Sequence, residues 1–401
     1  MKSIDDSPRE VAQLGSIMSL IASGEASTRT DLARRTGMSA STISQRANTL
    51  IDAGLLVDEG LSQSTGGRRA TLLRINPDAG VIVTAVLGAS SCRCALVDFH
   101  GRVLVSATIT LAVHEGPASC VKSVLAAIAR LLGEMTSAVP VRAVSVGIAS
   151  VVSPVNGSLV RPLMGSEWDG ARLSLSFEKA FPEVPVFISN DADLMAVGEY
   201  HARALDGHSL VFIKVGTGIG SGVIEGGRLV PGASGGAGDI GHIRIADRDD
   251  ARCTCGKTGC LTAVASGRAI ADRLRALGLE VAGSRDILNL VRNGDLESRH
   301  TLRAAAQDIG GVVATLVTFA NPDLIVIGGL LGDLCEDLLT DVRSAVYGIA
   351  QPLATANLSI ESSRLGENAA SVGAARVALD HLLSEAGLPR LLRAPLLHTP
   401  G

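Results

Sequence analysis

A strand pattern that occurs twice constrains the fold of this 401-residue chain more than any other feature. After Gly80, the runs VIVTAVLG, CRCALVDF and RVLVSATITL predict three successive strands, with His100-Gly101 in a hairpin turn. The same pattern of three successive strands is predicted again in the segment SLVFIKVGTGIGSGVIEGGRLV. Duplicated halves of this kind are typical of a two-lobed α/β fold with a cleft between the lobes.

Helices alternate with strands over the rest of this region. We expect helices over Ala118–Met135, 264–278, 300–319 and Ala370–Leu383, strands over Val141–Ile148 and Leu324–Ile327, and a strand running into a helix over 185–202. The first lobe is then expected over 79–195 and the second over 196–385, with the last helix returning to the first lobe. Residues 386–401 are expected to form a loose tail.

The first part of the chain has a different, helical character. Apolar residues recur at helical spacing over 11–22. Thr28 and Ser39 stand where the caps of two further helices are expected, and Gly37 and Gly54 stand where those helices must end. Three short helices in this order predict a small helical domain with a helix-turn-helix at its centre.

Two short strands follow these helices, Leu55–Glu59 and Ala70–Ile75, and they flank a polar, Gly-rich loop. A hairpin of this kind after three helices is typical of the wing of a winged helix domain. The Asn-Pro-Asp turn at 76–78 is the expected linker to the two lobes. We therefore predict a winged helix-turn-helix DNA-binding domain over 1–78.

The candidate DNA contacts lie on the second helix of the motif, just before it, and at the wing tip. They are Arg29, Ser41, Thr42, Gln45, Arg46, Arg68 and Arg69. Hydroxyl, amide and guanidinium groups can bind base edges and phosphates in the major groove, and arginine can enter a narrow minor groove. Residues 1–78 carry nine basic and nine acidic side chains, so a protein-interaction domain remains the alternative.

Composition excludes some function classes. The net charge is −4, so any DNA contact must come from a local surface. The first ten residues lack the apolar core of a signal peptide, and apolar runs fall short of the ~20 residues that span a membrane. Seven cysteines, three of them clustered, fit reduced thiols and one metal site better than disulfides. We expect a cytoplasmic protein with no membrane partner.

The cysteine cluster predicts a metal site. His242 is followed by Cys253, Cys255 and Cys260, the last three within the string CTCGKTGC. Three thiolates and one imidazole fill a tetrahedron, which suits structural zinc and leaves no open catalytic position. Unrelated buried thiols are the alternative.

Two further motifs could serve a cleft between the lobes. In GTGIGSG, the residues Gly216, Thr217, Gly218 and Gly220 could leave backbone N–H groups free to hold an anion, although a glycine-rich hairpin in a packed core is the alternative. Asn190 and Asp191 stand between a strand and a helix. That carboxylate could accept a proton from a sugar hydroxyl, although a plain helix cap has the same sequence.

Taken together, these motifs resemble the ROK family of repressors, open reading frames and kinases. The resemblance covers nearly the whole chain, and its most specific part is PGASGGAGDIGHIRI followed by CTCGKTGC. The segments GTGIGSG, SNDADL, CRCALVDFHGRVL and NPDLIVIGG also fit. The resemblance implies a two-lobed, actin-like (ribonuclease-H-like) ATPase fold. With an N-terminal winged helix, it implies a dimeric or tetrameric regulator of carbohydrate genes.

The resemblance also implies roles for single residues. Asn190, Asp191, Asp239, His242 and Thr262 would line the sugar site, with Asp191 at the position of the base in kinases. Asp239 stands where the family usually has Glu. His242 would bind zinc through one ring nitrogen and face the sugar with the other.

This sequence departs from the kinase pattern at two places. Val86 stands where kinases have the Asp that helps to hold the metal and phosphates, and Gly88-Ala89-Ser90 replaces Gly-Gly-Thr. Thr262 stands where the family has a Glu that binds the sugar. Valine cannot bind magnesium, so the resemblance implies a sugar sensor without kinase activity that binds operator DNA. A sugar kinase with an accessory DNA domain, and a regulator that responds to protein partners, are the alternatives.

Overall fold

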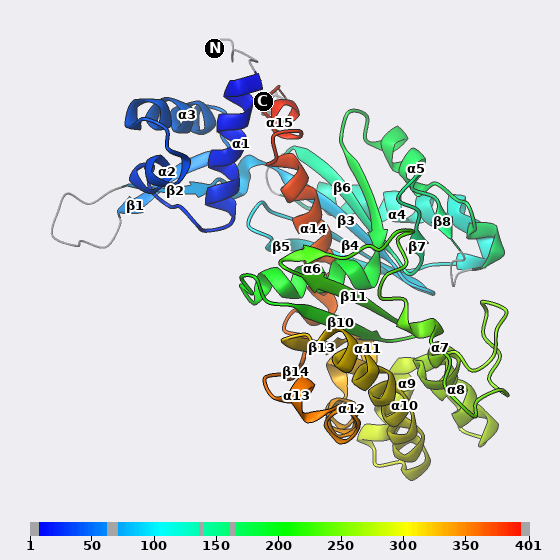
Figure 1. Ribbon diagram of the computed structural model, residues 1–401. Coiled ribbons are helices and arrows are strands. Elements are labelled where there is room, and N and C mark those ends of the chain that lie inside the picture. Colours follow the sequence, from blue (N-terminus) through cyan, green and yellow to red (C-terminus); the bar gives the residue numbers. More distant parts are fainter. Residues whose placement is uncertain (1–7, 62–70, 136–138, 161–164, 394–401) are drawn as a thin grey trace.

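The computed structural model describes residues 8–61, 71–135, 139–160 and 165–393. The chain forms a small N-terminal unit and a larger α/β part with two sheets (Figure 1). This confirms the predicted fold class.

The N-terminal unit contains three helices and a two-stranded hairpin. Its elements are α1 (Pro8–Ala22), α2 (Arg29–Thr36), α3 (Ala40–Asp52), β1 (Leu56–Leu61) and β2 (Thr71–Ile75). The strands pair antiparallel, with Leu56 opposite Ile75. The predicted wing tip, with Arg68 and Arg69, lies outside the described residues. The expected linker is a short 3-10 helix, η1 (Pro77–Ala79), whose first turn is capped by the Asn76 side chain.

The first five-stranded sheet follows η1. Its strands are β3 (Val81–Leu87), β4 (Ser91–Val97), β5 (Val103–Thr110), β6 (Val141–Ile148) and β9 (Val186–Asn190), in the order β5-β4-β3-β6-β9. A short hairpin, β7 (Val151–Val152) with β8 (Leu159–Val160), follows β6. Strand β3 is buried almost throughout because helices cover both faces of the sheet, which explains its continuous apolar run. Helices α4 (Gly116–Gly133) and α5 (Leu173–Ala180) cover one face.

The second five-stranded sheet has the same general plan. Its strands are β10 (Leu210–Val215), β11 (Ile219–Glu225), β12 (Arg228–Leu229), β13 (Leu324–Gly328) and β14 (Ser359–Ser362), in the order β12-β11-β10-β13-β14. The remaining helices are α6 (Asp191–Ala202), α7 (Leu261–Ala265), α8 (Gly267–Ala276), α9 (Ser284–Arg292), α10 (Leu296–Ala320), α11 (Gly329–Leu334), α12 (Glu336–Ile349), α13 (Pro352–Thr355), α14 (Ala369–Leu382) and α15 (Leu388–Arg393). The side chains of Val211 and Ile213 face the core under α10, whereas Phe212 faces α6 and α14.

Helices α6 and α14 pack tightly on each other where the two sheets meet (Figure 1). A Cβ atom on Gly198 of α6 would lie 2.3 Å from the carbonyl oxygen of Ala369 in α14. The two backbones are in contact there, which only glycine permits. Helix α14 also packs on β3, β4 and β6, so it ties the first sheet to α6.

The far end of α14 supports the N-terminal unit. Leu14 and Ile17 of α1 share one buried core with Leu382 of α14 and with Leu388 and Leu391 of α15. Helix α15 therefore packs beside α1, as Figure 1 shows in red and dark blue. The expectation of a loose tail from residue 386 is wrong for Leu388–Arg393, because this turn of helix buries two leucines.

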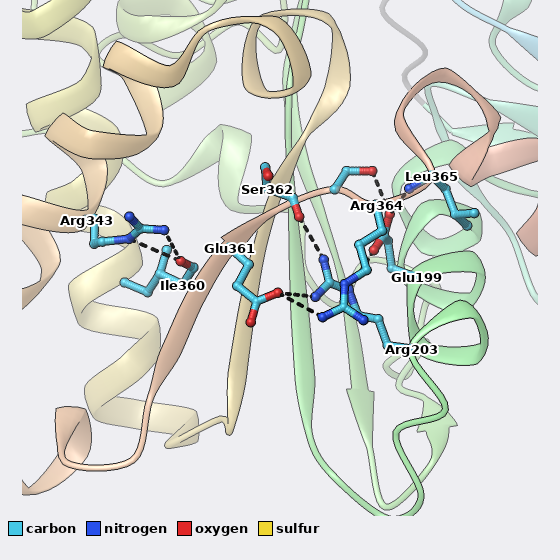
Figure 2. A network of polar contacts seen from close by, with 9 residues as sticks. Glu199, Arg203, Arg343, Ile360, Glu361, Ser362, Arg364 and Leu365 are labelled. Atoms are coloured by element: carbon cyan, nitrogen blue, oxygen red, sulfur yellow. Dashed lines mark hydrogen bonds and ion pairs between the residues drawn. The ribbon is translucent and has the colours of Figure 1, made fainter.

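A polar network fixes the other end of α6 to the second sheet (Figure 2). The Arg203 side chain, only 2% exposed, pairs with Glu199 of α6 and with Glu361 of β14, and it donates to the Ser362 carbonyl oxygen at 2.7 Å. Glu199 also accepts from the Leu365 N–H at 2.8 Å. These bonds satisfy a fully buried carboxylate, and they hold α6, β14 and the segment before α14 in one arrangement.

Two expectations need correction. The helix expected over 264–278 is broken at Ser266, which caps α8, because Gly267 must approach the Gly216 carbonyl. One helix, Val113–Gly133 including the turn before α4, has the length and mean hydropathy (1.2) of a membrane span, although the sequence led us to expect none. Its residues Cys120, Val124 and Ile128 pack against the first sheet as a core helix does.

Candidate functional site

The helix-turn-helix forms because its turn residues satisfy the exposed backbone of each helix. Thr28 Oγ1 accepts from the Asp31 N–H at 3.1 Å, and Ser39 Oγ accepts from the Thr42 N–H at 3.1 Å. Gly37 ends α2 in the left-handed region, with φ 70°. Ile43 and Leu50 of α3 are fully buried, so the opposite face of α3 is directed to solvent.

Several predicted DNA contacts lie on that solvent face. Ser41 and Gln45 are exposed, and Thr42 is partly exposed. The hydroxyls of Ser41 and Thr42 each lie 2.8 Å from Ser39 Oγ. Arg29 pairs with Asp58 of β1 at 2.9 Å, so its guanidinium is held at the junction of α2 and the hairpin.

Arg46 is placed differently from its expected position. Its guanidinium pairs with Glu10 and donates to Gln13 Oε1 at 3.0 Å, both on α1, and only 16% of the side chain is exposed. Position 46 lies one turn after Ile43 and so on the flank of α3 that faces α1. We therefore correct the expectation that Arg46 is presented to DNA: it fixes α3 on α1.

The predicted sugar contacts Asn190 and Asp191 occupy the end of β9 and the start of α6. Asn190 caps α6, its Oδ1 accepting from the Ala192 N–H at 2.8 Å, and its amide donates to the Ser150 carbonyl at 3.1 Å. Asp191 is the first residue of α6, where the helix dipole favours a negative charge. Its carboxylate is buried and forms an ion pair with Lys214 of β10. Asn190 thus caps the helix, and its second amide hydrogen and the Asp191 carboxylate can serve other contacts.

A second carboxyl, that of Asp193, lies two residues after Asp191 on α6. Burial, together with the charge of Asp191, raises the pKa of the Asp193 carboxyl to about 7. A Cβ on Gly222 of β11 would lie 2.9 Å from Asp193 Cα, so the first turn of α6 rests directly on the second sheet.

The glycine-rich turn packs against the segment that bears the metal cluster. The Gly216 N–H bonds to the Gly218 carbonyl at 3.0 Å, so it is not free to hold an anion as expected. A Cβ on Gly241 would lie 2.2 Å from the Ile219 carbonyl, and Gly220 approaches Ala192 of α6. Thr217 is exposed at the tip of the turn.

The two remaining predicted sugar contacts differ from each other. Asp239 is exposed. Thr262 is 2% exposed, and its hydroxyl accepts from the Ile219 N–H at 3.2 Å. Thr262 therefore supports the glycine-rich turn, and its hydroxyl still has a hydrogen to donate.

The predicted metal ligands come together. One donor atom from each of His242, Cys253, Cys255 and Cys260 lies within 4.8 Å of the others. His242 Nδ1 is 3.5 Å from Cys253 Sγ, and Cys255 Sγ is 3.6 Å from Cys260 Sγ. Ligands about 2.0–2.3 Å from a tetrahedral ion lie at such separations, so the set fits one metal ion.

Local glycines shape this cluster. Gly256 and Gly259 have φ of 90° and 71°, and the Cys253 N–H bonds to the Lys257 carbonyl at 2.8 Å. The tight turns bring Cys253 and Cys255 back toward Cys260. Because Nδ1 of His242 faces the cluster, Nε2 is the nitrogen left for another partner.

Val86 lies in an apolar contact between the lobes. If Gly147 had a Cβ atom, that atom would lie 3.5 and 3.6 Å from the two methyl groups of Val86, beside Leu194 of α6. Val86 also belongs to the apolar core around α14. Its neighbour across the sheet is Arg93, which donates to Asn368 at 2.7 Å just before α14. Position 86 is therefore occupied by a packed apolar side chain and not by a polar group.

Lys214, Glu10 and Gln13 were missed by sequence reasoning. A lysine inside the apolar strand VFIKV was the available signal for Lys214, since a charge in a buried strand requires a partner. Nothing in the sequence marks Glu10 and Gln13 as partners of Arg46. Two hollows on the second lobe, about 250 and 370 Å³, are lined by none of the residues of these sites.

Comparison with known proteins agrees with this architecture. The sequence pattern of the ROK family matches residues 83–381, and that of the IclR helix-turn-helix domain matches residues 11–60. The chain belongs to the ROK family.

Its relatives include repressors and kinases. The xylose repressors of Caldicellulosiruptor bescii and Bacillus subtilis are 28% and 27% identical to it, over 89% and 88% of this chain and 92% and 91% of their own. An N-acetylmannosamine kinase of Citrobacter koseri is 35% identical, but over only 49% of this chain and 65% of its own length.

Solved structures show the same fold. A ROK family transcriptional regulator, a homolog of the Escherichia coli MLC protein, has a TM-score of 0.80 at 23% identity, covering 97% of this chain and all of that one. A ROK glucokinase from Streptomyces griseus has a TM-score of 0.62 at 28% identity, covering 74% of this chain and 99% of its own. The kinase thus matches the chain without its N-terminal unit.

Proposed function

We propose that this protein is a DNA-binding transcription regulator, acting as a repressor of carbohydrate-utilisation genes in the cytoplasm. The observation that carries the proposal is the union of a helix-turn-helix with a ROK domain in one chain. A protein named xylose repressor aligns with both parts, over 92% of its own length. An N-acetylmannosamine kinase aligns over only 49% of this chain.

The DNA contacts of the proposal come from α3 and the wing. Ser41, Thr42 and Gln45 would face the major groove, with Arg29 and the wing residues Arg68 and Arg69 on the phosphates or in the minor groove. Arg46 would act indirectly, by fixing α3 on α1. Two copies in a homodimer or homotetramer would bind the two halves of a symmetric operator.

The effector of the proposal is a small carbohydrate bound between the lobes. Asn190, Asp191, Asp239 and His242 would contact it, and Thr262 would hold the glycine-rich turn behind it. Support comes from the buried Asp191 carboxylate beside the junction of the two sheets.

A continuous path of contacts connects Asp191 to the DNA unit. Helix α6 begins at Asp191 and packs along α14, and α14 shares a core with α15 and α1. A ligand that moves α6 would therefore move the surface on which the N-terminal unit rests. Such a ligand changes DNA affinity only if it binds the two arrangements unequally.

The metal of the proposal is a structural zinc ion bound by His242, Cys253, Cys255 and Cys260. The donor set supports zinc, because a Cys₃His site is closed and matches the tetrahedral preference of that ion. Zinc bound there would hold His242 in place behind the sugar, so this metal serves positioning rather than chemistry.

A kinase is the second candidate function. Asp191 at the base position favours it, whereas Val86 opposes it, because an aliphatic side chain offers no oxygen to magnesium or phosphate. An assay for ATP-dependent phosphorylation of D-glucose and N-acetylmannosamine separates the two. Turnover that Asp191→Asn abolishes would support the kinase.

The test of the regulator is DNA binding to the region upstream of its own gene, measured by gel shift at modest salt. We expect a specific complex that competitor DNA of random sequence does not remove, and its dissociation by one of D-xylose, D-glucose or N-acetylglucosamine. A regulator that responds to a protein partner instead would bind DNA but gain no thermal stability from any sugar. Protein that binds no upstream DNA contradicts the proposal.

A further inference from the structure

The buried ion pair between Asp191 and Lys214 connects the two lobes at the proposed sugar site. Asp191 follows β9 of the first sheet, and Lys214 lies in β10 of the second. Only 7% of the Asp191 side chain and 20% of the Lys214 side chain are exposed. The pair is therefore largely removed from water, although part of the lysine side chain remains exposed.

Lys214 lies between two glycines of the neighbouring strands. Its partners across the sheet are Gly220 of β11 and Gly328 of β13, neither of which has a side chain. A Cβ on Gly220 would meet Ala192 at 3.6 Å, which shows that this face is directed toward the start of α6. The lysine thus reaches Asp191 beside Gly220, whereas the Phe212 ring fills the space beside Gly328, where a Cβ would lie 2.4 Å from Phe212 Cζ.

The pair has unused hydrogen-bonding capacity. A lysine ammonium has three donors, and in the part of the chain that the structure describes Lys214 uses one, to Asp191 Oδ2. The second carboxylate oxygen of Asp191 has no hydrogen-bond donor among the same described residues. Unused donors of Lys214 and an unused acceptor of Asp191 therefore lie side by side in this pair.

We propose that Lys214 contacts the effector directly, and that Lys214 and Asp191 together bind hydroxyl groups of an uncharged monosaccharide. A sugar hydroxyl both donates and accepts, so one or two neighbouring hydroxyls can donate to Asp191 and accept from Lys214. This inference rests on the proposed sugar-responsive function and adds a specificity-determining residue to it.

Charge selects the neutral class of sugar. The charges of Lys214 and Asp191 cancel, and the other predicted contact at the site, Asp239, is also a carboxylate. A sugar acid or sugar phosphate would meet no unbalanced positive charge from these residues. A neutral hydroxyl inserts without leaving either member of the buried pair without a partner.

The test measures binding of D-xylose, D-glucose and their monodeoxy derivatives by calorimetry. The variants are Lys214→Met and Lys214→Gln, with Lys179→Met on the exposed surface of α5 as the matched control. The glutamine variant retains a donor that can still bond Asp191, so it keeps the experiment informative if Lys214→Met does not fold.

We expect one sugar to bind the wild type and the Lys179→Met control equally. Lys214→Met should weaken that binding by about 10–100-fold, as expected for the loss of a charge-assisted hydrogen bond, and Lys214→Gln by less. One deoxy derivative should lose at least about tenfold on the wild type and much less on Lys214→Gln, because its missing hydroxyl is the one that Lys214 contacts. If Lys214 had only a structural role, the deoxy derivative would lose the same affinity on the wild type and on Lys214→Gln.

Two results would overturn the inference, and they differ. Equal deoxy-sugar losses on wild type and Lys214→Gln would overturn the role of Lys214 but leave the regulator intact. A wild type that binds none of these sugars would overturn both the inference and the sugar response in the proposed function.

Discussion

A Cβ atom on Gly373 of α14 would lie 1.8 Å from the carbonyl oxygen of Leu194 in α6. The two helices therefore meet backbone to backbone, on the path from Asp191 to the N-terminal unit. Because neither backbone can shift without breaking its own hydrogen bonds, this contact is the least tolerant point of the path.

Replacing Gly373 with alanine should separate α6 from α14. We expect Gly373→Ala to lower the free energy of unfolding by at least about 3 kcal/mol, because the added methyl group overlaps a backbone atom. Gly311→Ala in α10 is the control, since a Cβ there meets nothing within 4 Å and alanine favours a helix. Denaturant unfolding checks both, and equal stability of the two variants would contradict the contact.

The helix-turn-helix offers a pair of neighbouring residues with opposite expected effects. Arg46→Ala should lower the stability of the N-terminal unit by about 1–2 kcal/mol, because it leaves the partly buried Glu10 without this partner. Gln45→Ala should leave stability unchanged and weaken DNA binding, because Gln45 is exposed on α3. Thermal melts and gel shifts of the two variants separate these outcomes. A fully stable Arg46→Ala protein would show that the ion pair is unimportant.

Metal analysis tests the cysteine cluster. We expect one zinc ion per chain, and Cys255→Ser or a strong chelator should release it and lower the melting temperature. Cys120→Ala is the matched control, because that thiol is buried in α4 but lies outside the cluster. Zinc-free protein of unchanged stability would contradict a structural metal.

The pH dependence of stability should contain a contribution from Asp193. The pKa of its carboxyl is raised to about 7 in the folded protein, so the native state binds a proton more tightly than the unfolded chain. Stability from this group is therefore complete below pH 4 and is lost as the pH rises toward 7. Asp193→Asn should remove this loss of stability. Between pH 4 and pH 8, the free energy of unfolding of the variant should therefore rise by about 2 kcal/mol relative to that of the wild type.

That difference is measured by denaturant unfolding of both proteins at several pH values. Asp333 also has a pKa raised to about 7 by burial and nearby carboxylates, so the difference between the two proteins, rather than either curve, isolates Asp193. Parallel curves over this range would show that Asp193 is not protonated in the folded state.

Local signals predicted much of the fold. Thr28, Gly37 and Ser39 each act through their own neighbours, so sequence alone located the helix-turn-helix correctly. The cluster of His242, Cys253, Cys255 and Cys260 was predicted because the spacing of these residues is short and their chemistry specific. Strand β3 was visible as an apolar run, since both of its faces are buried.

The failures involve contacts between segments distant in sequence. Arg46 looked available for DNA because its partners on α1 lie more than 30 residues earlier. The support that the Thr262 hydroxyl gives to the Ile219 N–H was not visible, because the two residues are 43 positions apart. Residues 388–393 looked loose because the leucines of α1 that cover them are at the other end of the chain.

The most direct test of the account is the affinity for upstream DNA measured by fluorescence anisotropy, with and without sugar. D-xylose and D-glucose are each added at saturation to wild type and to Asp191→Asn. The account predicts that one sugar weakens DNA binding of the wild type at least about tenfold and leaves the variant unaffected, a coupling free energy of about 1.4 kcal/mol. DNA affinity that is the same with and without every sugar would contradict it.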